Sequence, residues 1–166
     1  MKEIDDALIQ KDRMRYIKNK LSSNLCLLAI LLDVFFFVSI YKSDVSTYYY
    51  NILIGGSIIY NLLFMLLAFL SSEGVKEYSE RYSYIMIGLG VMQFVRIFII
   101  PMRAHRAVVT IQQTERIVME NGQFTRCLIY LILSGVCLIY GALVGIKRSR
   151  TLKAYVATLG EEKRRD

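Results

Sequence analysis

The sequence predicts an all-α, polytopic membrane protein with four transmembrane helices, and three observations carry that prediction. Hydrophobic residues make up 55% of the 166 residues, above the about 45–50% typical of a soluble domain. They are gathered in blocks of roughly 20 residues, with polar and basic segments between the blocks. Tyrosines cluster at the block edges, where an aromatic ring with a polar end favours the membrane–water interface.

Each apolar block has the roughly 20 residues that a helix needs to cross a hydrocarbon core about 30 Å thick. The blocks are continuous apolar runs, whereas the strands of a transmembrane barrel alternate over about 10 residues. We therefore expect four transmembrane helices, at about residues 22–41, 48–70, 82–101 and 127–146. They form a transmembrane domain over 22–146, preceded by an amphipathic segment over 1–21 and followed by a basic tail over 147–166.

The distribution of Lys and Arg predicts that both ends of the chain lie in the cytoplasm, with the cell membrane as the expected location. Of the 21 basic residues, 15 lie in the two tails and the middle loop, and five lie in the loops on the other side. Such an excess marks the cytoplasmic side. Four of the five opposite charges lie in one loop, 102–126. Whether that loop is outside the membrane or embedded in it stays open.

Two charged residues lie inside the apolar blocks. Counting from the cytoplasmic edge at 1.5 Å per residue, Asp33 is about 16 Å deep and Arg96 about 21 Å deep. Isolated charges at such depth cost several kcal/mol, and the offset is within the reach of an arginine side chain. We expect an ion pair between the first and third helices. The alternatives are that Arg96 extends toward the interface, or that either residue faces a partner subunit.

Two polar residues extend this intramembrane network. Gln93 lies one turn before Arg96 on the same helical face, and Asn61 is deep in the second helix. Small residues give a second packing signal, because glycines four apart let another helix approach closely. The sequence predicts helix packing at Gly141 and Gly145, which form a GxxxG pattern, and at Gly88 and Gly90.

The C-terminal tail predicts a short amphipathic helix that ends near Gly160. Its apolar residues are spaced i, i+3, i+4 and i+7, and its basic residues lie where anionic headgroups are expected. One interpretation is a helix lying on the lipid surface; the other is a docking helix for a partner. The residues concerned are Arg148, Arg150, Leu152, Lys153, Tyr155, Val156 and Leu159.

The loop 102–126 holds a second basic group, formed by Arg103, His105 and Arg106. Arginine binds phosphate through paired hydrogen bonds, so this group is a candidate contact for a lipid phosphate or an anionic partner. No other metal-ligating residues accompany His105 in the sequence. The alternative to a role in phosphate binding is that His105 is an ordinary surface histidine. No metal site is expected.

Residues 50–63 and 130–143 agree at seven of fourteen aligned positions. One interpretation is a fold of two tandem helical hairpins, since parallel repeats occur in membrane proteins. The other is chance, because apolar spans share a small alphabet of residues. Both remain open at this stage.

Motifs for catalysis and cofactor binding are missing: there is no Gly-rich phosphate loop, HExxH, CxxC or GxSxG. We expect no enzyme activity and no cofactor. Nucleic acid is not an expected partner, because the basic residues flank apolar blocks. The expected function is a non-catalytic integral membrane subunit that assembles with or stabilises a larger complex. The alternative is a small homo-oligomeric transporter or channel that uses Asp33, Gln93 and Arg96. The expected partners are lipids with anionic headgroups, and other membrane subunits or a second copy.

Overall fold

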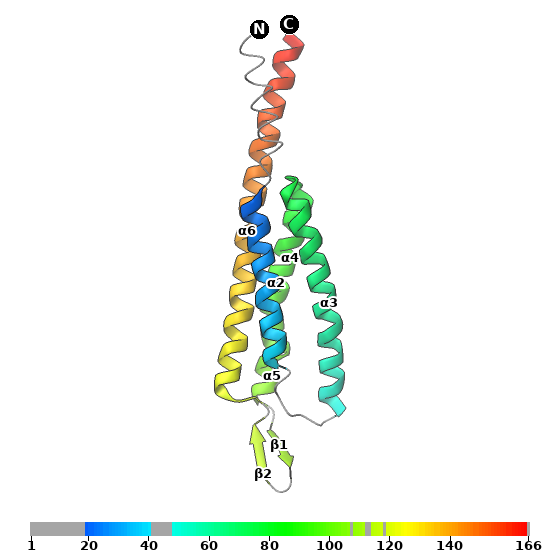
Figure 1. Cartoon of the computed structure of the whole chain (residues 1–166), viewed down its shortest axis with the longest axis vertical. Coiled ribbons are helices and arrows are strands. Elements are labelled where there is room, and N and C mark those ends of the chain that lie inside the picture. Colours follow the sequence, from blue (N-terminus) through cyan, green and yellow to red (C-terminus); the bar gives the residue numbers. More distant parts are fainter. Residues whose placement is uncertain (1–18, 41–47, 107, 112–113, 118, 166) are drawn as a thin grey trace.

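The computed structural model describes residues 19–40, 48–106, 108–111, 114–117 and 119–165 (Figure 1). Four of its helices are long and apolar enough to cross a membrane, which confirms the predicted all-α, four-helix architecture. The predicted amphipathic segment falls almost wholly outside the described residues. The elements are α2 (Lys20–Ile40), α3 (Tyr48–Lys76), α4 (Glu80–Ile99), α5 (Pro101–Arg106), β1 (Val108–Ile111), β2 (Thr114–Ile117) and α6 (Asn121–Arg165).

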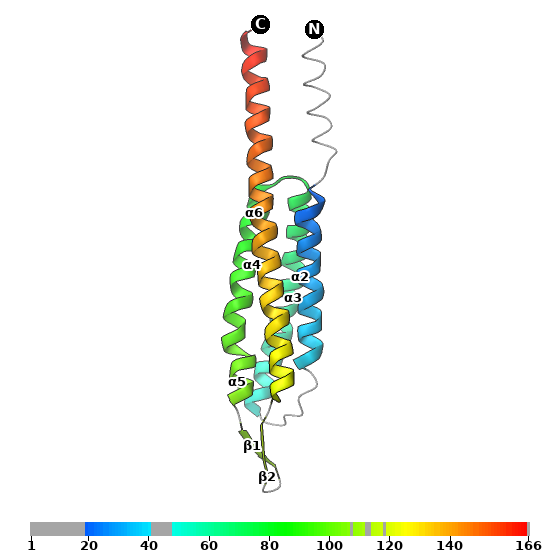
Figure 2. The same ribbon diagram turned by 90° about the vertical axis from the view of Figure 1, so that its left-hand side faces the viewer.

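The four long helices form an up-down-up-down bundle in which neighbours run antiparallel (Figures 1 and 2). Each of α2 and α4 packs against both α3 and α6, so the order around the bundle is α2, α3, α4, α6. One end of the bundle holds the start of α2 and the turn between α3 and α4; we call it the terminus end. The other holds α5 and the two strands; we call it the hairpin end. Short connections favour this arrangement.

The buried positions of each helix alternate between four and three residues apart. This is the spacing with which antiparallel helices present one seam to their neighbours. In this bundle most positions of the seam hold small or polar residues, which allow the backbones to approach closely. On α2 the seam is Ser22, Cys26, Ala29, Asp33 and Phe36, and on α3 it is Ser57, Asn61, Phe64, Ala68, Ser71 and Val75.

The outward faces carry the large apolar side chains. Leu62, Leu66, Phe98 and Leu143 are all more than half exposed. A soluble protein does not leave so many large apolar side chains in water. Polar residues inside and apolar residues outside are what a bilayer requires, because lipid solvates the outer face.

The turn between α3 and α4 ends α3 in a Schellman motif. Ser79 N–H donates to the carbonyl oxygen of Gly74 at 3.2 Å, and Tyr78 N–H donates to that of Val75 at 3.1 Å. These bonds satisfy carbonyls at the helix end. They also hold Tyr78 at φ 59°, a left-handed conformation that glycine usually takes. The Tyr78 carbonyl in turn accepts a hydrogen bond from the Ser149 hydroxyl, which joins the turn to α6.

The loop 102–126 contains structure that the sequence analysis did not anticipate. It begins with the six-residue helix α5 and continues as an antiparallel hairpin. The hairpin pairs Val108 with Ile117 and Ile111 with Thr114. β-branched residues on both strands favour this pairing. The hairpin extends beyond the ends of the long helices (Figure 1), whereas Ala104 and Met119 of the same loop are buried with Phe36 and Ile97.

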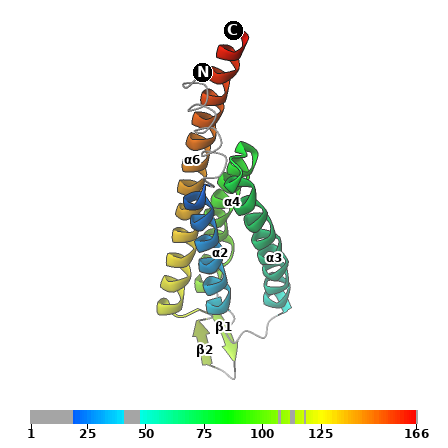
Figure 3. The same cartoon turned by 45° about the horizontal axis from the view of Figure 1, so that its top comes forward.

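The fourth predicted helix and the C-terminal tail are one continuous helix. α6 has 45 residues and is therefore about 68 Å long. It passes Gly160 without a break, so the predicted stop is wrong: helical hydrogen bonding tolerates a single glycine at a cost of about 1 kcal/mol. Beyond the bundle α6 continues along its own axis and projects past the terminus end (Figures 2 and 3). A separate helix lying on the lipid surface is not what the structure has.

Candidate functional site

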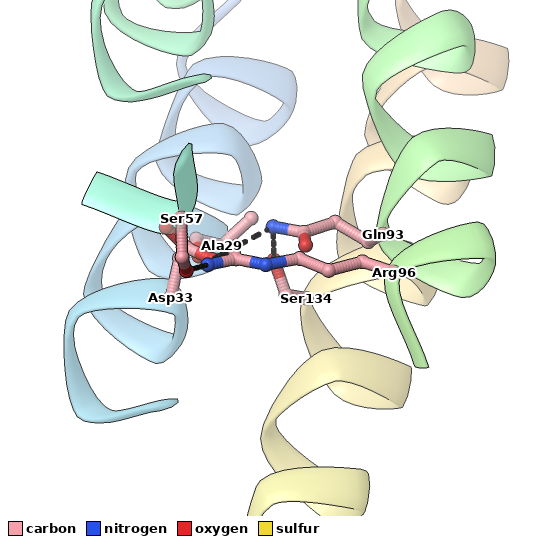
Figure 4. A network of polar contacts seen from close by, with 6 residues as sticks. All are labelled: Ala29, Asp33, Ser57, Gln93, Arg96 and Ser134. Carbon is pink, nitrogen blue, oxygen red and sulfur yellow. Dashed lines mark hydrogen bonds and ion pairs between the residues drawn. The ribbon is translucent and has the colours of Figure 1, made fainter. Parts of the chain in front are cut away.

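Asp33 and Arg96 form an ion pair across α2 and α4 in the interior of the bundle (Figure 4). Arg96 Nη1 lies 2.8 Å from Asp33 Oδ1, and the two side chains are 3% and 1% exposed. The pair predicted from the depths of the two residues is therefore present. The register of the two helices explains it, since Asp33 lies seven residues before the end of α2 and Arg96 three before the end of α4.

Gln93 and Ser134 extend the pair toward α6. The Gln93 amide nitrogen donates to Asp33 Oδ1 at 3.0 Å and lies 3.4 Å from the Ser134 hydroxyl oxygen. The Ser134 hydroxyl donates to the carbonyl oxygen of Ala29 at 3.0 Å. Asp33 Oδ1 thus accepts two hydrogen bonds, one of them from a charged donor, which are the stronger kind.

Arg96 is also held on the side that faces α3. Its Nη2 donates to the Ser57 hydroxyl at 3.1 Å. The guanidinium carbon lies 4.4 Å from the centre of the Phe36 ring and 4.7 Å from that of the Tyr60 ring. Both distances are within the range of cation–π attraction. The arginine is therefore fixed by a carboxylate, a hydroxyl and two ring faces, and residues of all four helices meet in one polar layer.

Apolar clusters close the polar layer on both sides. Toward the terminus end it is covered by the buried Phe64, Met86 and Leu138. Toward the hairpin end the cover is Phe36, Ile97 and Leu131. Low dielectric on both sides strengthens each polar contact and raises the cost of any that is missing. Within the described bundle, the layer is an enclosed plane of polar groups between two apolar ones.

Several buried polar atoms of this layer have no hydrogen-bond partner among the described residues. They are Asp33 Oδ2, Tyr60 Oη, Asn61 Oδ1, Gln93 Oε1 and Arg96 Nε. Native interiors contain few such atoms. Three are oxygens that can only accept unless the carboxylate is protonated, so the layer has spare acceptor capacity for a small polar species. Asn61 was predicted as a member of the network and is buried beside it.

Three of the four predicted packing glycines lie at close helix contacts. A Cβ on Gly90 would be 2.8 Å from Ile139 Cγ1, one on Gly141 would be 3.1 Å from Met86 Cε, and one on Gly145 would be 2.6 Å from Ser83 Oγ. The structure does not support Gly88, because a Cβ there would meet nothing within 4 Å. Gly88 lies on the outward face of α4, about 200° around the helix from Gly90 at 100° per residue.

A second set of polar contacts joins the helices at the terminus end. The Ser23 and Ser72 hydroxyl oxygens lie 2.6 Å apart, and the Ser22 hydroxyl donates to the Gly141 carbonyl. Arg148 Nη1 donates to Asn19 Oδ1 at 2.8 Å. These contacts bind α2 to α3 and α6.

The basic residues of α6 that were predicted to contact lipid or a partner are exposed around this end. Arg150 Nη2 lies 3.4 Å from the Tyr84 hydroxyl, and Lys153 Nζ lies 2.9 Å from Glu80 Oε2. Leu152 is half-buried. The side chains of Tyr155, Val156 and Leu159 lie outside the described part of the structure.

The three basic residues predicted to act together in the loop 102–126 do not share one surface. Arg103 and Arg106 are exposed at the end of α5. His105 turns the other way: its ring stacks on Phe124 with centres 4.5 Å apart, and its Nδ1 lies 3.2 Å from the carbonyl oxygen of Met119. It packs α5 against the start of α6, so it does not join the two arginines at the surface.

Sequence reasoning missed Ser57, Ser134 and Gly135. A Cβ on Gly135 would be 2.9 Å from Phe94 Cε2 and 3.2 Å from the Gly90 carbonyl oxygen. These three residues could have been predicted from the alternating four- and three-residue spacing of small and polar residues along each apolar block. Serine carries no charge and is common in transmembrane helices, so it does not stand out without that spacing.

A crevice opens between α3 and α4 at the hairpin end, on the outer side of the polar layer. Its volume is about 260 Å³. α3 diverges from the other helices toward this end, as Figure 3 shows. The lining residues are Gly56, Ser57, Tyr60, Met92, Val95, Arg96, Ile99 and Ile100.

The fold and the site define a polytopic α-helical membrane protein with a buried ion-pair layer. A comparison of the chain with protein-family models, with curated proteins and with solved structures finds no match.

Proposed function

We propose that the protein is a small, non-catalytic membrane subunit that holds a partner protein through the projecting part of α6. The continuity of α6 carries this proposal. Beyond Arg150 the helix extends for about 22 Å, past the terminus end of the bundle (Figure 2). Leu152, Tyr155, Val156 and Leu159 share one face of this helix by their spacing. An apolar face on a helix that has left the bundle suits the groove of a partner protein.

The polar layer supports the same proposal. Its two charges are paired with each other within the chain, and apolar clusters cover the pair on both sides. Such a layer fixes the register of four helices, the best-attested use of buried polar groups. The bundle then acts as a rigid anchor for the projecting helix.

The test is a truncation that ends the chain at Arg150. We expect cross-linking in native membranes, followed by purification in mild detergent, to yield a partner chain at fixed stoichiometry with the full-length protein and none with the truncated form. The bundle's thermal unfolding should change little, because the exposed Lys153–Glu80 pair is worth about 0–1 kcal/mol. Leu143→Ala, on the lipid-facing side of α6, is the control and should retain the partner. Retention of the partner by the truncated chain would refute the proposal.

A small homo-oligomeric transporter or channel is the second candidate. The observation in its favour is the group of unpartnered acceptor oxygens on Asp33, Asn61 and Gln93, which suit a transient cation or water. This candidate requires a stable homo-oligomer that moves ions across liposomes. Asn61→Leu should then abolish the flux while the oligomer stays intact. A purified single chain with no flux would exclude it.

We also propose that both termini lie in the cytoplasm and that the membrane is the cell membrane. Lys20 and Arg165 lie at the same end of the bundle (Figure 1), and the 15 basic residues of the tails and the middle loop favour the cytoplasm. A reporter that is active only outside the cell, fused after Asp166, should be inactive. Activity of that fusion would reverse the orientation.

A further inference from the structure

Two cationic side chains, those of Arg103 and Arg106, follow the crevice between α3 and α4 at the hairpin end. Met92 and Ile99 line the crevice on α4, and Arg106 follows Ile99 after another seven residues. α5 follows α4 directly: Ile100 N–H donates to the Arg96 carbonyl oxygen at 3.0 Å at the end of α4, and Ala104 N–H donates to that of Ile100 at 2.9 Å at the start of α5. Arg103 and Arg106 are exposed on α5, three and six residues after Ile100, the last residue that lines the crevice.

The depth of these groups matches the two parts of a lipid. α4 is 20 residues long and spans the about 30 Å of the hydrocarbon core. Ile99 is thus at the edge of the hydrocarbon, and Arg106 lies about 10 Å beyond it, among the headgroups. The apolar crevice lies on the hydrocarbon side of that edge and the two arginines on the headgroup side.

Polar groups near the crevice are already engaged. Arg96 Nη2 is bound to Ser57 and Nη1 to Asp33, and the charges of Asp33 and Arg96 cancel. A charged or strongly polar occupant of the crevice itself would gain little there. Its volume of about 260 Å³ is below the about 300–1,000 Å³ of sites that enclose a drug-sized ligand. A hydrocarbon chain fits these constraints.

The position of the arginines is itself unusual. The loop 102–126 holds four of the five basic residues that lie opposite the basic side of the membrane, against the usual asymmetry. Binding of an anionic headgroup gives these charges a reason to be there, because arginine forms charge-assisted hydrogen bonds with phosphate.

We propose that the crevice holds one acyl chain of an anionic glycerophospholipid whose phosphate is bound by Arg103 and Arg106. The chain fills the space between α3 and α4 at the point where α3 diverges. The phosphate takes charge-assisted hydrogen bonds from the guanidinium groups. This inference is independent of the proposed docking role of α6, because it concerns the opposite end of the bundle.

The headgroup is tested by native mass spectrometry of the purified full chain with phosphatidylglycerol or phosphatidylcholine of identical acyl chains. We expect the wild-type protein to retain one phosphatidylglycerol in preference to phosphatidylcholine. Arg106→Gln should weaken that preference about fivefold. Arg126→Gln, which removes an exposed arginine from the same end of the bundle, should leave it unchanged. Equal retention of both lipids by the wild-type protein would overturn the proposal.

The acyl chain is tested by filling the crevice. Gly56 lines it, and a Cβ there would meet nothing within 4 Å, so Gly56→Leu should place its side chain in the crevice without disturbing the fold. We expect retention of both lipids to fall. Gly55→Leu is the matched control, because Gly55 has equal space around it but does not line the crevice. An equal loss of lipid in the two variants, or no loss in either, would refute the crevice as the binding site.

Discussion

Gly90 of α4 and Gly135 of α6 face each other, and each lies against the backbone of the other. A Cβ on Gly90 would be 3.1 Å from the Gly135 carbonyl oxygen, and one on Gly135 would be 3.2 Å from that of Gly90. This reciprocal contact brings the backbones of α4 and α6 together. It lies on the terminus side of the polar layer, about one turn from Gln93 and directly beside Ser134.

Alanine at Gly90 should destabilise the bundle, although alanine is the better helix former. The added methyl group would also meet Ile139 Cγ1 at 2.8 Å, and overpacking of this kind costs about 1–3 kcal/mol. Gly88→Ala is the matched control two residues away, with open space around the new methyl and a helix-propensity gain of up to about 1 kcal/mol. Thermal unfolding in detergent should therefore shift in opposite directions for the two variants. Equal shifts would show that the Gly90 contact is absent.

The Asp33–Arg96 pair should show strong energetic coupling. Removing one partner of a buried pair costs about 3–5 kcal/mol, whereas replacing both with apolar residues costs much less. We expect Asp33→Leu and Arg96→Leu each to lower the stability more than the double variant does. A double-mutant cycle from unfolding in detergent measures this coupling.

The Glu80–Lys153 pair serves as the comparison for that cycle. Its N–O distance of 2.9 Å nearly equals that of the buried pair, but its side chains are 20% and 66% exposed. Exposed pairs are coupled by about 0–1 kcal/mol. Similar coupling energies for the two pairs would mean that burial of Asp33 and Arg96 has no energetic consequence, contrary to our expectation.

The Tyr78→Gly variant of the protein should be more stable than the Tyr78→Ala variant. The φ of 59° at Tyr78 costs an L-residue about 1–2 kcal/mol, and both variants remove the same ring. Val136 is exposed in the middle of α6 and serves as the control. There Val136→Gly should be less stable than Val136→Ala, because glycine within a helix is about 1 kcal/mol less favourable than alanine. Thermal unfolding of the four variants tests the difference in sign. A Tyr78→Ala variant as stable as Tyr78→Gly would contradict the strained turn.

The four transmembrane helices and the ion pair follow from the sequence for simple reasons. Runs of about 20 apolar residues have few alternatives to a transmembrane helix. Two charges of opposite sign at similar depth have few partners other than each other. Asp33 and Arg96 were therefore predictable without any knowledge of how the helices pack.

Other features depend on which face of its helix a residue occupies. A continuous apolar run in the sequence does not show which face packs against another helix. Gly88 and Gly90 look alike in the sequence, yet only Gly90 faces α6. The tandem-repeat interpretation, which stays a prediction, aligns Gly55 with Gly135, yet only Gly135 lies at a helix contact. The continuity of α6 was hidden for another reason, since Lys147 and Arg148 mark the membrane edge whether or not the helix ends there.

The small and polar residues at the helix contacts change the usual relation between residue size and tolerance of substitution. In a water-soluble domain the large buried side chains are the ones that cannot change. Here large side chains such as Leu62 and Phe98 face lipid, which accepts any apolar shape. Gly90, Ser134 and Gly135 lie where the helices touch, and each is limited to the side chain it has. Selection acting on this protein would thus preserve the small residues at the helix contacts as strictly as the buried Phe36 and Phe64, and would allow the large residues that face lipid to drift.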